Sequence, residues 1–175
     1  MLVNILNTDF SDKLRKFEIP TCLRVCAGTD GSVTFLLEIM TRHDVNVLTE
    51  KQHQVPADES MASLFDINVG NDVNCRVVML VAGGIPYVYA KSLAPVERMP
   101  ESVCQDMMRA DIPIGKILRE HGIETRRDFD TIEIIKGDSL FGCESVLSRS
   151  YKIIHNGDVL MWINEQMPVD GRWDL

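Results

Sequence analysis

The sequence has 175 residues, 45% of them hydrophobic, and a formal net charge of −8, which predicts one globular domain over residues 1–175. The charge disfavours nucleic acid or an anionic membrane as a partner, so an anionic ligand would need local cations that reverse the overall field. No run reaches the roughly 18 uncharged apolar residues of a spanning helix, and residues 1–10 lack signal-peptide features, so we expect a cytoplasmic protein.

In chain order, the first half of the sequence indicates helices separated by one strand. Apolar residues near helical spacing predict a helix over 2–17. The turn Thr29-Asp30-Gly31-Ser32 supplies a capping serine for a helix over 32–42. Residues 45–54 are typical of a strand, and residues 57–65 of a short helix.

The second half carries two β-hairpin signals, the pairs Gly83-Gly84 and Asn156-Gly157, each between two apolar runs. The predicted elements are strands over 73–81, 85–93, 129–136, 145–154 and 159–167, and helices over 100–110 and 113–121. Strands and helices do not alternate regularly, which favours an antiparallel sheet over a parallel one. The expected fold class is α+β, with a single antiparallel sheet of about six strands covered by helices.

The first hairpin places two cations in a largely apolar setting. If Gly83 and Gly84 form a two-residue loop, Arg76 lies directly opposite Lys91 on the neighbouring strand. Like charges opposed across a sheet destabilise it, and an anionic group held between them would relieve the repulsion. Two alternatives stay open: this end of the hairpin frays into solvent, or an acidic side chain satisfies both cations.

These residues belong to a series of segments that resembles the chorismate pyruvate-lyase family, and within it the archaeal, cyanobacterial and actinobacterial branch. The resemblance covers roughly residues 20–168. The segments are, in order, Asp30-Gly31-Ser32-Val33-Thr34, the hairpin 74–92, Asp111-Ile112-Pro113-Ile114-Gly115, Thr125-Arg126-Arg127-Asp128-Phe129 and the last strand ending in Asn164-Glu165. No single segment is specific, but all five occur in order with compatible spacing.

The resemblance implies a ligand enclosed beneath helical flaps and a set of site residues. Arg76 would bind a ring carboxylate, the backbones of Val33 and Ile114 would contact the ligand, and Glu165 would lie near the ring hydroxyl and handle a proton. Lys91 stands where the family often has a second arginine, so charge is kept but the bidentate grip of a guanidinium is lost. Arg76, Lys91 and Glu165 are therefore the candidate catalytic residues.

Two assignments near these residues stay open. Glu165 lies one residue closer to the following proline, Pro168, than the family pattern suggests. Either a bulge absorbs this difference or Asn164 takes the inward position. Arg126 and Arg127 are expected as surface charges at a strand entry, with a role at the pocket mouth as the alternative.

The resemblance also implies the activity: cleavage of chorismate into 4-hydroxybenzoate and pyruvate without metal or cofactor, by a monomer or homodimer. One alternative is a lyase that acts on a related enolpyruvyl acid. Another is a non-catalytic sensor of aromatic acids, because the same fold forms the effector-binding half of certain transcription regulators. Those regulators carry a helix-turn-helix domain before this fold, and only about 20 residues precede it here, which disfavours a regulator. The five scattered cysteines predict neither a disulfide framework nor a zinc site.

Overall fold

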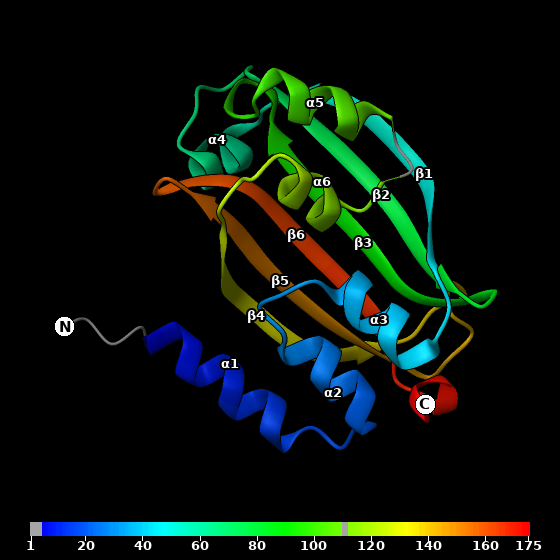
Figure 1. Cartoon of the computed structure of the whole chain (residues 1–175). Helices are drawn as coiled ribbons and strands as arrows, with labels where there is room; N and C mark the ends of the chain where they lie inside the picture. Colours follow the sequence, from blue (N-terminus) through cyan, green and yellow to red (C-terminus); the bar gives the residue numbers. More distant parts are fainter. Residues whose placement is uncertain (1–4, 110–111) are drawn as a thin grey trace.

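The computed structural model describes residues 5–109 and 112–175 and contains one six-stranded antiparallel sheet (Figure 1). The spatial order of its strands is β1-β2-β3-β6-β5-β4. Their bounds are β1 Val45–Pro56, β2 Asp72–Ala82, β3 Ile85–Pro95, β4 Arg126–Lys136, β5 Ser145–His155 and β6 Asp158–Pro168. The prediction of an α+β fold with a six-stranded antiparallel sheet is confirmed.

Six α-helices accompany the sheet in the described residues: α1 Ile5–Lys16, α2 Thr21–Gly28, α3 Val33–Thr41, α4 Glu59–Phe65, α5 Glu101–Met108 and α6 Ile114–Glu120. Five of them were predicted, and α2 was not. Ser32 caps α3 as expected, since its side chain accepts a hydrogen bond from the Phe35 backbone. The predicted residues 2–4 of the first helix, residue 110 of a later one and Asp111 of the family-like segment lie outside the described residues.

Both predicted hairpins form, and their turns need the residues found there. Gly83, Gly84, Asn156 and Gly157 all have positive φ angles, between 52° and 92°, as a two-residue turn of this hand requires. Each hairpin also has a β-bulge next to its turn. Such a bulge puts one extra residue into one strand, and it exchanges the faces on which all later residues of that strand lie.

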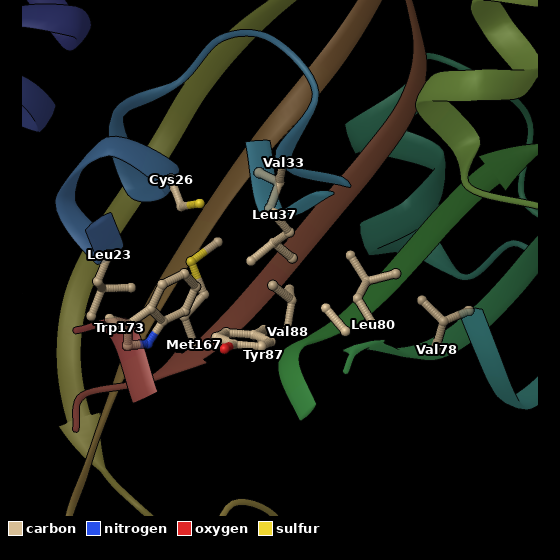
Figure 2. Packing of buried hydrophobic residues seen from close by; sticks show 11 residues of the cluster. Leu23, Cys26, Val33, Leu37, Val78, Leu80, Tyr87, Val88, Met167 and Trp173 are labelled. Atoms are coloured by element: carbon tan, nitrogen blue, oxygen red, sulfur yellow. The ribbon is translucent and has the colours of Figure 1, made fainter. Parts of the chain in front are cut away.

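The helices cover the two faces of the sheet unequally. Figure 1 shows α3 and α6 in front of the central strands β3 and β6. Buried residues of α2 and α3 pack on this face, where Figure 2 shows Leu23, Cys26 and Leu37 beside Val88 and Met167 of the sheet. Helices α5 and α6 form a second cluster on the same face. The two clusters thus lie over different parts of the same face.

Other elements cover parts of the opposite face. Helix α4 packs there through Phe65 against Val73 and Leu93. Phe141, in the segment between β4 and β5, packs there against Met79. In the described residues, no helix is long and apolar enough to cross a membrane.

Candidate active site

A cavity lies between the sheet and its covering helices, on the face that α3 and α6 cover. It contains about 620 Å³ of empty space, its opening to solvent included. Its floor comes from β2, β3, β5 and β6, and its roof from the segments that begin α3 and α6. The lining is largely aliphatic and includes four residues that the sequence predicted for the site: Val33, Arg76, Ile114 and Glu165. The structure thus brings these four residues together, and their contacts with a ligand stay predictions.

Arg76 is the cation on the floor of the cavity. Its side chain is 2% exposed, and its neighbours on the adjacent strands are Gln52 and Ser92. Its Nη2 atom donates a hydrogen bond of 3.0 Å to the carbonyl oxygen of Ile112, just before α6. Arg76 thus places a buried positive charge at the floor of the cavity.

Glu165 lies in the same cavity and forms a buried ion pair that the sequence analysis did not predict. Its carboxylate is close to Arg149, which is 0% exposed. The Nε atom of Arg149 donates to Oε2 of Glu165 at 2.7 Å, and Nη2 lies 2.7 Å from the same oxygen. The Nη1 atom of Arg149 donates to the carbonyl oxygens of Ala27 and Thr29. Arg149 therefore neutralises Glu165 and also fastens the segment that leads into α3.

Tyr151 completes this network at the second oxygen of the carboxylate. Its hydroxyl donates a hydrogen bond of 3.1 Å to Oε1 of Glu165. Burial raises the pKa of Tyr151 above its usual range, the Glu165 carboxylate acts in the same direction, and Arg149 and Arg127 oppose them. Tyr151 therefore stays a neutral hydrogen-bond donor at neutral pH, beside the carboxylate that is the candidate proton acceptor.

The thiol of Cys26 interacts electrostatically with Arg149 and Glu165 of this network. Burial raises the pKa of Cys26 to about 12, while Arg149 acts against burial. A thiol protonated to that extent is a poor nucleophile. Nucleophilic catalysis by Cys26 is therefore disfavoured.

Val33 and Ile114 stand at equivalent places in the roof. Val33 is the first residue of α3, and Ile114 is the first residue of α6. Amide groups in the first turn of a helix are not used by the hydrogen bonds of the helix itself. This position suits the backbone contacts predicted for both residues.

Lys91 does not lie in the cavity, because the predicted register of the first hairpin is wrong beyond its turn. Val81 pairs with Pro86 as predicted, but Tyr87 is an extra residue in β3, so Leu80 pairs with Val88 and Arg76 with Ser92. Lys91 pairs instead with Val77 and Asn164, on the opposite face of the sheet, where it is exposed. Ser92 takes the place opposite Arg76.

The second hairpin also has a bulge, and this one turns a predicted site residue toward the cavity. Leu160 is an extra residue in β6, so Glu165 pairs with Arg149 and faces the cavity. Asn164 points to the other face, where its side-chain amide donates to Ser148. Of the two residues left open by the sequence, Glu165 is the one that faces the cavity. The bulge lies before it at Leu160, and the pairing from Glu165 to Pro168 is regular.

Arg127 lines the cavity as well, although the sequence favoured a surface position for it. Its Nη1 atom donates a hydrogen bond of 2.7 Å to the carbonyl oxygen of Asp30, just before α3. Its guanidinium lies over the ring of Tyr151, 5.7 Å from the centroid. The neighbouring Arg126 is exposed and pairs with Asp128, as a surface charge should.

The fold defines a class of α+β domains built on one six-stranded antiparallel sheet. Among solved structures, the effector domain of PhnF from Mycobacterium smegmatis superimposes with a TM-score of 0.68, at 18% identity over 80% of this chain and 90% of that one. The ligand-binding domain of a GntR-family regulator from Bordetella bronchiseptica gives a TM-score of 0.60, at 15% identity over 73% of this chain and 86% of that one. At these identities the similarity is one of fold.

Sequence comparison identifies the family within this class. Residues 28–173 match the model of the family described as Chorismate pyruvate-lyase Rv2949c-like, and the chain belongs to that family. It is 36% identical over 162 residues to "Putative lyase MJ0807" of Methanocaldococcus jannaschii, covering 85% of this chain and 79% of that protein. It is 24% identical over 157 residues to chorismate pyruvate-lyase of Mycobacterium tuberculosis, covering 82% and 77%. The resemblance predicted from the sequence is confirmed at the level of the family.

Proposed function

We propose that this protein is a chorismate lyase that eliminates pyruvate from chorismate to give 4-hydroxybenzoate, with no metal or cofactor taking part. The observation that carries the proposal is the placement of Arg76 and Glu165 on one inward face of the sheet, in the lining of the same cavity. They lie two strands and one side-chain repeat apart, about 12 Å between Cα atoms on a regular sheet. The aliphatic floor between them includes Val78 and Ala90. A six-membered ring with a carboxylate at one end and a hydroxyl at the other suits this space.

The reaction requires the protein mainly to orient the substrate and to stabilise the charge that develops on the leaving oxygen. The bond between ring carbon C3 and the ether oxygen breaks, the proton on C4 leaves, and the electron pair of that C–H bond completes an aromatic ring. The departing enolpyruvate takes up a proton and becomes pyruvate. A cavity that excludes water and fixes the ring supplies orientation and strengthens electrostatic stabilisation of the leaving oxygen.

Each site residue has a role in this scheme. Arg76 anchors the ring carboxylate with the planar fork that carboxylates prefer, and the backbones of Val33 and Ile114 contact the ligand from the roof. Glu165 accepts the C4 proton, directly or through the Tyr151 hydroxyl that is bonded to it. Arg149 holds the Glu165 carboxylate in position.

The proposal is tested by incubating the purified protein with chorismate and following 4-hydroxybenzoate by ultraviolet absorbance and pyruvate by coupled lactate dehydrogenase. We expect the two products in equal amounts. Pyruvate with a different aromatic acid would support a lyase for a related enolpyruvyl acid. Binding of 4-hydroxybenzoate without turnover would support a sensor, the alternative that the similarity to effector domains favours. Either of the last two results would overturn the proposal.

Substitution of Lys91 tests the corrected register. We expect Lys91→Ala to leave the affinity for 4-hydroxybenzoate within about twofold of the wild type, because an exposed charge on the far face is screened from the cavity. Isothermal titration calorimetry measures this affinity. Ser92→Leu is the matched change on the inward face, and it should abolish binding by filling the floor. A tenfold loss in Lys91→Ala would contradict the register.

A further inference from the structure

Arg127 occupies the wall between the enclosed cavity and the outside. Besides the cavity, it lines two outer hollows. One outer hollow also contains Arg15, Arg24 and Asp30, and the other contains Arg119. The Arg127 side chain therefore faces both the cavity and the two outer hollows.

The partners of Arg127 leave its charge without a neutralising side chain. Among the described residues, no carboxylate forms an ion pair with Arg127, and its buried Nε atom has no hydrogen-bond partner. Its hydrogen bonds go to neutral groups, the carbonyl oxygen of Asp30 and the hydroxyl of Tyr151. Arg149 differs, since it is committed to Glu165. An uncompensated cation at the wall of an apolar cavity favours an anionic ligand group.

Arg127 and Arg76 lie on strands toward opposite edges of the sheet. Arg76 is on β2 and Arg127 on β4, four interstrand spacings apart, or about 19 Å along a regular sheet. Tyr151 lies between them in strand order, with its ring beneath the Arg127 guanidinium. A ring bound at Arg76 and Glu165 would therefore direct a substituent that points toward β4 at Arg127.

We propose that Arg127 binds a second carboxylate, carried on an ether substituent of the ring, so that the cavity selects dicarboxylates over monocarboxylates. This inference deepens the proposed lyase function and rests on it for the position of the ring. In that reaction Arg127 holds the enolpyruvyl carboxylate while the C3–O bond breaks, and it stays with the pyruvate half afterwards. The aromatic product, which has lost this carboxylate, does not need Arg127. Arg127 thus supplies the second cation of the cavity, which the sequence analysis expected in Lys91.

The experiment compares two stable ligands that differ by one carboxylate, 3-(carboxymethoxy)benzoate and 3-methoxybenzoate. Both ligands are already aromatic, so neither can undergo the elimination. Calorimetry therefore measures binding alone. We expect the wild type to prefer the dicarboxylate, and Arg127→Gln to lose that preference by roughly 10- to 100-fold, the range of one charged hydrogen-bonded contact. Affinity for the monocarboxylate should stay within about threefold. Arg127→Lys, which keeps the charge without the fork, should retain an intermediate preference.

Arg126→Gln is the control, because it removes the adjacent, exposed arginine of the same strand. Equal weakening of both ligands in Arg127→Gln would indicate a structural role and overturn the inference, as would an unchanged preference in both Arg127 variants. If Arg127→Gln does not fold, the Lys variant decides: a preference equal to that of the wild type overturns the inference. The test is independent of turnover. A protein that does not cleave chorismate but shows the Arg127 effect would refute the lyase and retain the dicarboxylate site.

Discussion

Arg76→Met is expected to lower the affinity for 4-hydroxybenzoate by at least about a hundredfold and to abolish turnover of chorismate. The change keeps a long side chain in the floor but removes the charge, and two charged hydrogen bonds to a carboxylate in an enclosed site contribute roughly 3–5 kcal/mol. Calorimetric titration with 4-hydroxybenzoate measures the effect without reference to catalysis.

The control for this variant is Arg98→Met. Arg98 also donates to backbone carbonyls, those of Val159 and Asp66, but it does not line the cavity. It should bind the product as the wild type does. Affinity in Arg76→Met equal to that of the wild type would show that the carboxylate is held elsewhere and would remove the central element of the proposed function.

The second large effect concerns stability. Arg149→Met is expected to lower the free energy of unfolding by about 3–5 kcal/mol, because it leaves the Glu165 carboxylate buried without its partner. The double change Arg149→Met with Glu165→Met should cost much less than the sum of the two single changes, since it removes both charges. Urea denaturation of the wild type, the two single variants and the double variant gives this coupling free energy.

The exposed pair of Lys13 and Asp9 in α1 is the matched control. A cycle of the same design on that pair should give a coupling below about 1 kcal/mol. Additive effects at Arg149 and Glu165 would show that the two side chains do not interact in solution as they do in the structure.

The elements of the fold could be predicted from sequence because their signals are local. Two glycine-containing turns, a serine cap and regular apolar spacing specify five helices and six strands. Helix α2 was missed for a physical reason: it has eight residues, Pro20 stands at its N-cap, and no side-chain cap marks its start. Its burial of Leu23 and Cys26 becomes visible only once the sheet is in place.

The residues of the site could be predicted only where the pairing register of the strands could be predicted. The run from Ile85 to Ala90 is apolar throughout, so no break in alternation marks the bulge at Tyr87 that moves Lys91 out of the cavity. The same applies at Leu160, where a regular hairpin would have paired Arg149 with Asn164. The family resemblance named Glu165 as a site residue but left open whether Glu165 or Asn164 faces inward. The partner of Glu165 on β5 depends on a contact across strands that no sequence spacing specifies.

The two arginines that line the cavity share one arrangement, which links ligand binding to the segments that cover the cavity. Each donates a hydrogen bond to a backbone carbonyl immediately before a roof helix: Arg76 to Ile112, before α6, and Arg127 to Asp30, before α3. A bound dianion would pin both guanidinium groups and, through them, both entry segments of the roof. Stronger binding of the two carboxylates therefore slows dissociation of the ligand. For the proposed lyase, we therefore expect product release to be slower than bond breaking.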